Sequence, residues 1–203
     1  MLRVVVLGAA AGGGVPQWNC GCPVCSAARQ RPALQSTQAS IAISADDEHW
    51  FLINASPDLR QQLTATPQLH PKPGHLRHSP IAGVILTNDE VDAVAGLLSM
   101  REGSPFTIYA HSRVLAILKS NSIFNVLGES VQREAIEIDK PFEPKRRDGS
   151  SSGIAVLPFA VPGKGAWYLE GTAEDGNADG DTLGLRIADK ATGKHFFFLA
   201  ACA

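Results

Sequence analysis

Three cysteines crowd into a short stretch near the start of the chain, in the order Cys-x-Cys-x-x-Cys: Cys20, Cys22 and Cys25. Thiolates at this spacing can converge on one soft cation. Zinc prefers four tetrahedral ligands in proteins, and closed, thiolate-rich zinc sites are usually structural. The pattern therefore predicts a structural zinc site with one ligand still to be found. That ligand is either one of the six histidines or a residue beyond Ala203.

Two other interpretations of the cysteines stay open. The first is a set of three free, buried thiols, because free cysteine behaves as a small hydrophobic residue. The second is a local disulfide, which is disfavoured because Cys20 and Cys22 are too close in sequence to bridge easily. Clustered cysteines in a cytosolic protein are more typical of a metal site than of disulfides.

A second group of polar residues follows the apolar run Ile81–Leu86, which reads as a buried strand. Asn88, Glu90 and Asp92 alternate along this stretch, so an extended loop would present three oxygen donors on one side. Such donors suit a metal ion or a polar substrate, and ligands bind at the carboxyl ends of strands in α/β sheets. The alternative is a helix N-cap by Thr87 or Asn88, with the acidic residues in the first turn.

The elements that must position these residues alternate between strands and short helices, which predicts an α/β fold. Ser56 is expected to cap a helix with Pro57 at its first position, and Ser112 is expected to cap another. Expected strands cover 2–7, 38–44, 50–53, 81–86, 105–110, 154–161, 166–169, 182–188 and 194–200.

Composition bounds the class of protein. The 203 residues are 44% hydrophobic and 19% charged, which predicts one domain spanning 1–203. A net charge of -2 gives no reason to expect nucleic acid or an anionic membrane as a partner. No apolar run approaches the roughly 20 residues of a membrane span, and no signal peptide is recognised, so we expect a cytoplasmic location. The apolar pattern of 195–203 predicts a covering layer that lies beyond Ala203 or is missing.

Two further features have ordinary explanations. The glycines of 8–14 lack dinucleotide-loop spacing and lead into a cysteine cluster rather than a helix, so we interpret them as a tight turn. His70, His75 and His78 lie in a proline-rich loop, where solvated side chains are more common than metal ligands.

Taken together, the motifs resemble the metallo-β-lactamase superfamily, and more narrowly the pyrroloquinoline quinone (PQQ) biosynthesis protein B family. The resemblance runs along the whole chain. It implies an αββα sandwich with a mixed sheet in each half, and it assigns a structural zinc to the cysteines. It rests on Gly-Gly-Gly-Val-Pro-Gln-Trp-Asn-Cys-Gly-Cys (12–22), Asn-Ala-Ser-Pro-Asp-Leu-Arg-Gln-Gln (54–62), Gly-Leu-Leu-Ser-Met-Arg-Glu-Gly (96–103) and Gly-Asp-Thr-Leu-Gly-Leu-Arg (180–186).

The chain departs from the superfamily at its metal loop, His-x-His-x-Asp-His. The corresponding positions here are Asn88, Glu90, Asp92 and Ala93, so only the aspartate is retained. A further superfamily aspartate is Asn54 in this chain. The later ligands, a histidine near 161–163 and an aspartate near 201–202, are also absent from the sequence. A two-zinc hydrolase site is therefore not encoded, and we expect neither β-lactamase nor phosphodiesterase activity.

The resemblance implies that the protein helps to make the redox cofactor PQQ from a cross-linked Glu–Tyr precursor. It would do so together with other PQQ biosynthesis proteins. One hypothesis is an iron-dependent oxidation or hydroxylation of the tyrosine-derived ring, with Asn88, Glu90 and Asp92 near the iron. Iron(II) normally takes at least one imidazole ligand, and this loop has none. The other hypothesis is a non-catalytic carrier that moves PQQ or its precursor towards the periplasm.

Overall fold

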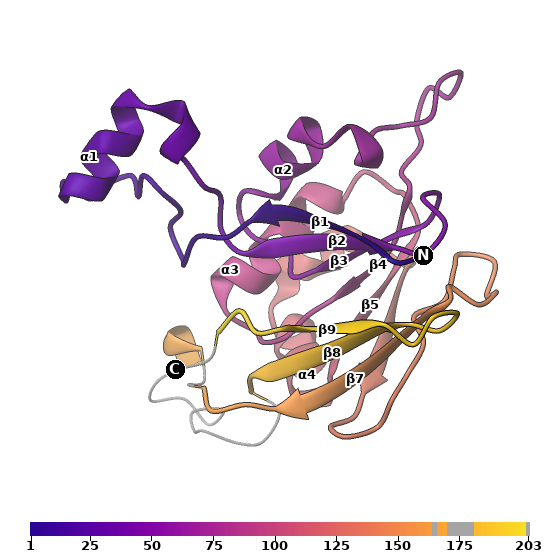
Figure 1. The fold of residues 1–203 in the computed structure, drawn as a ribbon. Helices are drawn as coiled ribbons and strands as arrows, with labels where there is room; N and C mark the ends of the chain where they lie inside the picture. Colours follow the sequence, from indigo (N-terminus) through magenta and orange to yellow (C-terminus); the bar gives the residue numbers. More distant parts are fainter. Residues whose placement is uncertain (164–165, 170–180, 202–203) are drawn as a thin grey trace.

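A computed structural model describes residues 1–163, 166–169 and 181–201. Two β-sheets face each other in it, and helices cover the larger one (Figure 1). The expected aspartate position at Cys202 and most of the loop before Asp181 lie outside the described residues. The strands of the larger sheet are β1 Arg3–Gly8, β2 Ser40–Ser44, β3 Trp50–Ile53, β4 Ile81–Ile85, β5 Phe106–His111 and β6 Val131–Ile136. Those of the smaller sheet are β7 Ile154–Ala160, β8 Leu183–Asp189 and β9 His195–Phe198.

The strands of the larger sheet follow the chain order β1 to β6. The strand pairs β1–β2 and β2–β3 are antiparallel, whereas β3 to β6 run parallel, so this sheet is mixed. The described strands of the smaller sheet are all antiparallel, and the mixed second sheet that we expected is not seen in them. Parallel strands place their carboxyl ends at one edge, which is where the loop after β4 lies.

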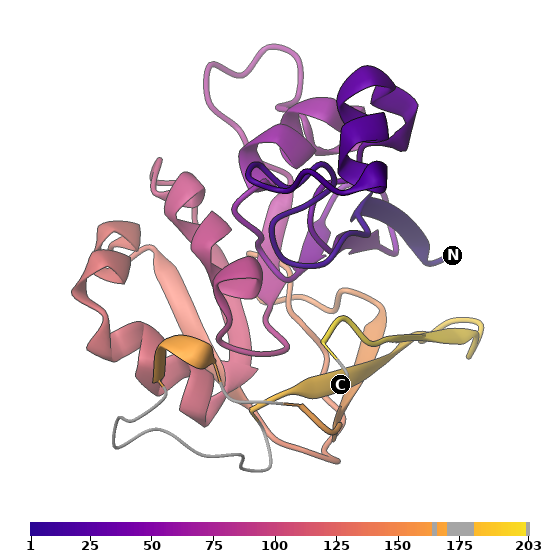
Figure 2. The same ribbon diagram turned by 90° about the vertical axis from the view of Figure 1, so that its left-hand side faces the viewer.

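The helices pack on one face of the larger sheet and the smaller sheet packs on the other (Figure 2). Trp50, Leu52 and Val84 point towards the helices, and their neighbours Phe51 and Ile53 point between the sheets. This alternation is what a strand buried on both faces requires. The helices are α1 Pro23–Gln30, α2 Leu59–Ala65, α3 Val91–Val94 and α4 Ser112–Ser120, with short 3₁₀ segments at Pro32–Leu34, Pro67–Leu69, Ala95–Met100, Ser122–Leu127 and Trp167–Leu169.

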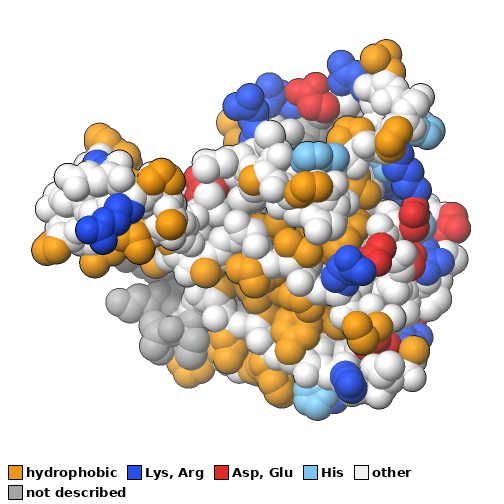
Figure 3. Space-filling model, turned by 45° about the horizontal axis from the view of Figure 1, so that its top comes forward, with side chains coloured by type: hydrophobic (Ala, Val, Ile, Leu, Met, Phe, Trp, Pro, Cys, Tyr) orange, Lys and Arg blue, Asp and Glu red, His pale blue; other side chains and the backbone are white. Residues whose placement is uncertain are grey.

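Three layers of the predicted sandwich are confirmed: the helices, the larger sheet and the smaller sheet. Among the described residues, no α-helix follows α4 in the sequence. Exposed apolar side chains lie on the two edge strands, Val4 and Val6 on β1 and Phe197 on β9. Figure 3 shows an apolar surface on this side of the molecule. A surface of this kind is where another protein layer commonly packs.

Four local predictions differ from the structure. Ser112 was expected to cap a helix, but it is the first residue of α4 and His111 occupies the N-cap. Helix α2 begins at Leu59, not at Pro57, and Ser56 does not cap it, because the preceding backbone is held by hydrogen bonds from Gly96 N–H to Ala55 C=O and from Ala55 N–H to Ala93 C=O. The segment 166–169 was expected to be a strand, but Trp167–Leu169 is a 3₁₀ turn. Strand β6 was not predicted, because its sequence is largely polar and most of its residues are exposed.

None of the described helices has both the length and the apolar character that crossing a bilayer would require.

Candidate functional site

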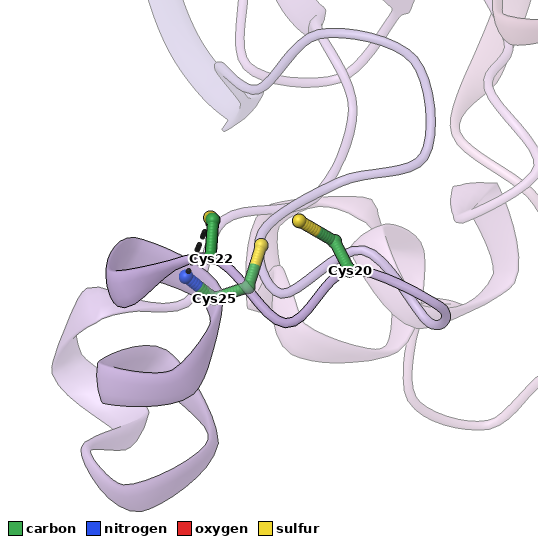
Figure 4. Close-up of side chains that lie close together, drawn as sticks. All are labelled: Cys20, Cys22 and Cys25. Carbon is green, nitrogen blue, oxygen red and sulfur yellow. Dashed lines mark hydrogen bonds between the residues drawn. The ribbon is translucent and has the colours of Figure 1, made fainter.

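The segment 17–25, which contains the three cysteines, forms a knuckle that projects from the body of the protein together with α1 (Figure 1). Cys22 is the N-cap of α1, and its Sγ accepts a hydrogen bond from the Cys25 N–H at 3.4 Å. The Sγ atoms of Cys20, Cys22 and Cys25 all lie within 4.8 Å of one another (Figure 4). The structure thus brings together all three thiols that the spacing singled out.

An arginine fixes the backbone of the knuckle. The Arg29 guanidinium on α1 donates to the carbonyls of Gln17, Trp18 and Cys20, at 2.9, 3.3 and 2.7 Å. Three carbonyls of one turn therefore converge on one cation, which holds the turn that carries Cys20 against the helix that carries Cys25. Sequence reasoning missed Arg29, since nothing in its spacing distinguishes it from a surface arginine.

The surroundings of the thiols lower the pKa of one of them, which favours the thiolate form that binds metal. The Cys25 backbone N–H, with help from the neighbouring thiols, lowers the pKa of Cys22 to about 7. For Cys25 the Gln17 backbone N–H also lowers the pKa, but burial and the two other thiols outweigh it and raise the pKa overall. Cys25 is buried, whereas Cys22 is exposed. Soft sulfur donors on three sides fit zinc and leave a fourth position open.

The loop after β4 is built very differently. Asn54 adopts φ 62° and holds the loop through its side chain: its Oδ1 accepts from the Thr87 backbone N–H at 2.9 Å, and its Nδ2 donates to the Thr87 hydroxyl at 2.9 Å. The amide supplies both an acceptor and a donor, and a carboxylate at this position would lack the donor.

The second sheet also fixes the loop. The Leu183 N–H at the start of β8 donates to the Thr87 carbonyl at 2.8 Å, and the Tyr168 hydroxyl donates to the Asp89 carbonyl at 2.8 Å. Both contacts come from segments far along the sequence. Contacts from distant segments therefore help to hold the loop in place.

The expected alternation of Asn88, Glu90 and Asp92 does not extend through the loop, because Asp92 lies in the first turn of α3. Asn88 is buried, and its Oδ1 accepts from the Glu90 N–H at 3.2 Å. Glu90 and Asp92 are half-buried. The helix-cap interpretation fails as well: Glu90 occupies the N-cap without a side-chain cap bond, and Thr87 is bonded to Asn54 instead.

Asp92 faces the glycine turn near the start of the chain. A Cβ at Gly12 would lie 3.4 Å from Asp92 Oδ2, and one at Gly14 would lie 3.8 Å from Asp58 Oδ2. Asp58 Oδ2 also accepts from the backbone N–H and the side-chain amide of Gln38, at 2.9 and 3.0 Å. The glycine turn therefore passes two carboxylates at van der Waals range. A cavity of about 200 Å³ opens beside Asp58.

A buried ionisable group that the spacing did not single out is Asp89. Burial raises its pKa, the Asp181 carboxylate raises it further, and Arg113 partly opposes both. Arg113 Nε donates to Asp181 Oδ1 at 2.7 Å. Burial and the carboxylates of Asp89 and Glu90 also raise the pKa of Tyr168. These residues are remote in sequence, so no local pattern indicated that they meet.

Within the part of the chain that the structure describes, the cysteines are the one group of three or more His, Cys, Asp or Glu whose ligand atoms gather as a metal site requires. The loop histidines do not join such a group. His70 Nε2 lies 2.9 Å from the Thr64 carbonyl, and His78 Nδ1 accepts from the Lys72 N–H. The rings of His75 and His78 lie 5.5 Å apart between their centroids.

Comparison with known proteins agrees with this architecture. The β-lactamase superfamily domain matches residues 49–203. Coenzyme PQQ synthesis protein B of Bradyrhizobium diazoefficiens is 73% identical over the whole chain, and that of Gluconacetobacter diazotrophicus is 50% identical; the chain spans 67% of each.

Solved structures agree too. Zn²⁺-bound PqqB from Methylobacterium extorquens superposes with a TM-score of 0.89 at 47% identity, covering all of this chain and 66% of that one. A diphosphatase of the PhnP family shares the fold alone, with a TM-score of 0.67 at 20% identity over 93% of this chain and 63% of that one. The chain belongs to the PQQ synthesis protein B family, within the metallo-β-lactamase superfamily.

Proposed function

We propose that the protein takes part in PQQ biosynthesis by binding the tyrosine-derived precursor at the edge formed by Asn88, Glu90 and Asp92. The observation that carries the proposal is the 73% identity, over the whole chain, to a coenzyme PQQ synthesis protein B. The edge supports it chemically. It offers half-buried carboxylates at the carboxyl end of a parallel strand, where α/β proteins bind their ligands.

In this proposal Cys20, Cys22 and Cys25 hold one structural zinc, with a histidine from beyond Ala203 as the fourth ligand. The gathered thiols support it, as does the zinc in the related PqqB structure. The zinc would stabilise the turn at Gln17–Cys20, which follows the glycine turn beside Asp92 in the chain. Its role is to hold that turn in place, and it supplies no reacting group.

An iron site does not fit the described residues of this edge. Iron(II) oxygenases use two histidines and one carboxylate with open positions. No such group gathers among the described residues, although His111 ends β5 at the same edge of the sheet. We therefore propose that the edge binds the precursor, and we assign it no iron-dependent reaction. A carrier that hands PQQ or its precursor on towards the periplasm needs only such a binding edge.

Substitution of the two half-buried carboxylates tests the binding edge. Glu90→Ala and Asp92→Ala should keep the fold, with the free energy of unfolding changed by about 1 kcal/mol or less. Each should abolish support for PQQ production when it replaces the intact protein in a producing cell. Glu129→Ala removes an exposed carboxylate elsewhere and is the matched control. If both variants support full PQQ production, the binding edge lies elsewhere; if both unfold, the carboxylates are structural.

Product analysis separates the carrier from the oxygenase. The zinc-loaded protein is incubated with the precursor, iron(II) and oxygen, and the products are examined by mass spectrometry. A hydroxylated product that requires Glu90 and Asp92 would establish the iron-dependent oxidation. Binding of the precursor without a change in its mass supports the carrier. We further propose that the protein works in the cytoplasm alongside the other PQQ biosynthesis proteins, which supply and receive this ligand.

A further inference from the structure

A second polar cleft, of about 410 Å³, lies on the face of β4, β5 and β6 that points between the sheets. Its lining includes Ala82, the second residue of β4, and Phe106, the first residue of β5. None of the residues that line it belongs to the loop after β4, so it is a different site from the one at Glu90 and Asp92. Side chains of β5 and β6 form its floor: Thr107, Tyr109, Gln132 and Glu134. The hairpin Lys145–Gly149 forms its roof.

The roof is held rigidly by contacts from distant parts of the chain. The Tyr109 hydroxyl accepts from the Lys145 backbone N–H at 2.9 Å. The Arg146 guanidinium pairs with Asp46 at 2.8 Å. The Arg147 guanidinium donates to the carbonyls that precede and begin β4, Ser79 and Ile81. Each of the three basic residues is thus anchored, so the cleft is preformed.

Two cationic groups of this roof remain incompletely satisfied. Arg146 Nε is buried and has no hydrogen-bond partner among the described residues. Arg147 contacts backbone carbonyls, and no described carboxylate lies within ion-pair distance of its guanidinium. A buried donor without an acceptor costs free energy, and native structures rarely leave one without a reason. An oxyanion in the cleft would give the Arg147 guanidinium a charged partner, whereas Arg146 Nε is shielded from the cleft by its burial.

The floor carries the opposite charge. Tyr109 points between the sheets and pairs in register with Glu134, and Thr107 pairs with Gln132, so all four side chains belong to the same face. No described cation lies within ion-pair distance of Glu134. A carboxylate and an amide on this face can accept hydrogen bonds from an ammonium group. The polar inner face also explains why β6 lacks an apolar pattern.

From the Arg147 guanidinium without a carboxylate partner on one wall and the Glu134 carboxylate without an ion pair on the other, we propose that this cleft binds a small zwitterion of the amino-acid type. The carboxylate of the ligand lies against Arg147, and its ammonium lies against Glu134. A cleft of this volume is within the range of small-molecule sites and accommodates a free amino acid. This site is separate from the proposed precursor edge and does not depend on it.

Nuclear magnetic resonance titration of the zinc-loaded protein tests the proposal with three probes. L-glutamine carries both charges, butyrate carries only the carboxylate, and butylamine carries only the ammonium. We expect L-glutamine to give saturable shifts of the Lys145 and Gly149 amides. Because each charge-assisted contact is worth about tenfold in affinity, butyrate and butylamine should each bind about tenfold more weakly.

Three variants locate the binding site. Arg147→Gln and Glu134→Gln should each weaken L-glutamine binding about tenfold. Lys140→Gln removes an exposed charge just before the hairpin and should leave the affinity unchanged. Glu134 is exposed, so its conservative change keeps the test valid if Arg147→Gln fails to fold. The proposal is overturned if L-glutamine gives no saturable shift, if butyrate binds as tightly as L-glutamine, or if Glu134→Gln leaves the affinity unchanged.

Discussion

The cysteine knuckle and the loop after β4 both carry residues capable of chemistry, but they are shaped in opposite ways. The knuckle is local: a helix N-cap, one arginine and three thiols within a few residues of one another determine its geometry. The loop is non-local: Asn54 and Leu183 fix Thr87 from far along the chain in either direction. A locally built site can be read from residue spacing, whereas a site built by distant contacts cannot.

This contrast predicts different responses to substitution. Residues of the knuckle should affect metal content more than the fold, since the knuckle projects from the body. Residues that clamp the loop should affect stability more than chemistry. Residues inside the loop should have smaller effects, of either sign.

The largest effect is expected for the knuckle. Cys25→Ser should lower the zinc content from about one ion per chain to near zero, because a hydroxyl is a poor substitute for a thiolate ligand. Elemental analysis measures the zinc, and the melting temperature should fall with it. Ser26→Ala, one residue further on, is the control and should keep the metal. Unchanged zinc content in Cys25→Ser would refute the assignment of this thiol.

A smaller, purely structural effect is expected for the clamp. Asn54→Ala removes the side-chain bonds to Thr87 and leaves a buried donor unpaired, which should lower the free energy of unfolding by about 2–4 kcal/mol. Urea denaturation measures this loss. Asn125→Ala, an exposed position, should change stability little. Equal stability of the two variants would show that the loop does not need its clamp.

A still smaller effect of opposite sign is expected inside the loop. Because the pKa of Asp89 is raised in the folded protein, its ionisation costs stability as the pH rises above the unfolded value of about 3.9. Asp89→Asn should therefore stabilise the protein at pH 7 by about 1 kcal/mol, and the gain should vanish below about pH 4. Thermal melting across this pH range measures the difference.

Asp148→Asn is the counterpart for that experiment. The Ser150 hydroxyl and N–H lower the pKa of Asp148, so ionisation of this group favours the folded state. Its amide variant should give no gain at pH 7. A stabilising Asp148→Asn together with a neutral Asp89→Asn would reverse the interpretation of the loop.

The last prediction is a null result. The zinc-loaded protein should hydrolyse neither β-lactams nor phosphodiesters above background, since Asn88 and Ala93 supply no imidazole for a two-zinc site. Chromogenic substrates of both classes measure the turnover. Activity above background that disappears in Asp92→Ala would contradict this prediction and would place a hydrolytic metal beside the glycine turn.

These regions also show how far sequence reasoning reaches. Apolar runs such as Ile81–Leu86 predicted their strands correctly, because burial on both faces imposes an apolar sequence. Strand β6 escaped prediction since its inner face lines a polar cleft. Ser56 has every mark of an N-cap, yet tertiary hydrogen bonds to the backbone of Ala55 delay the helix to Leu59. At Ser56, the local preference for a helix cap did not decide where the helix begins, because distant hydrogen bonds already satisfy the neighbouring backbone.

For the candidate site, spacing identified the three cysteines and the structure brings them together. It also identified Glu90 and Asp92 but assumed an extended loop, and the early start of α3 removes that alternation. The neighbours Asp89, Arg113 and Tyr168 gave no signal because their proximity depends on the packing of the second sheet.

The hydrogen bond from Leu183 to Thr87 has a consequence for biogenesis. During synthesis the knuckle residues leave the ribosome early, and they can assemble while most of the chain is still being made. The loop after β4 emerges later. It cannot take its final shape until β8 has also emerged and docked, because the Thr87 carbonyl accepts its hydrogen bond from Leu183 at the start of that strand. Pairing of such distant segments is slow compared with local turn formation. The nascent protein would therefore bring its three thiols together long before it acquires its binding edge.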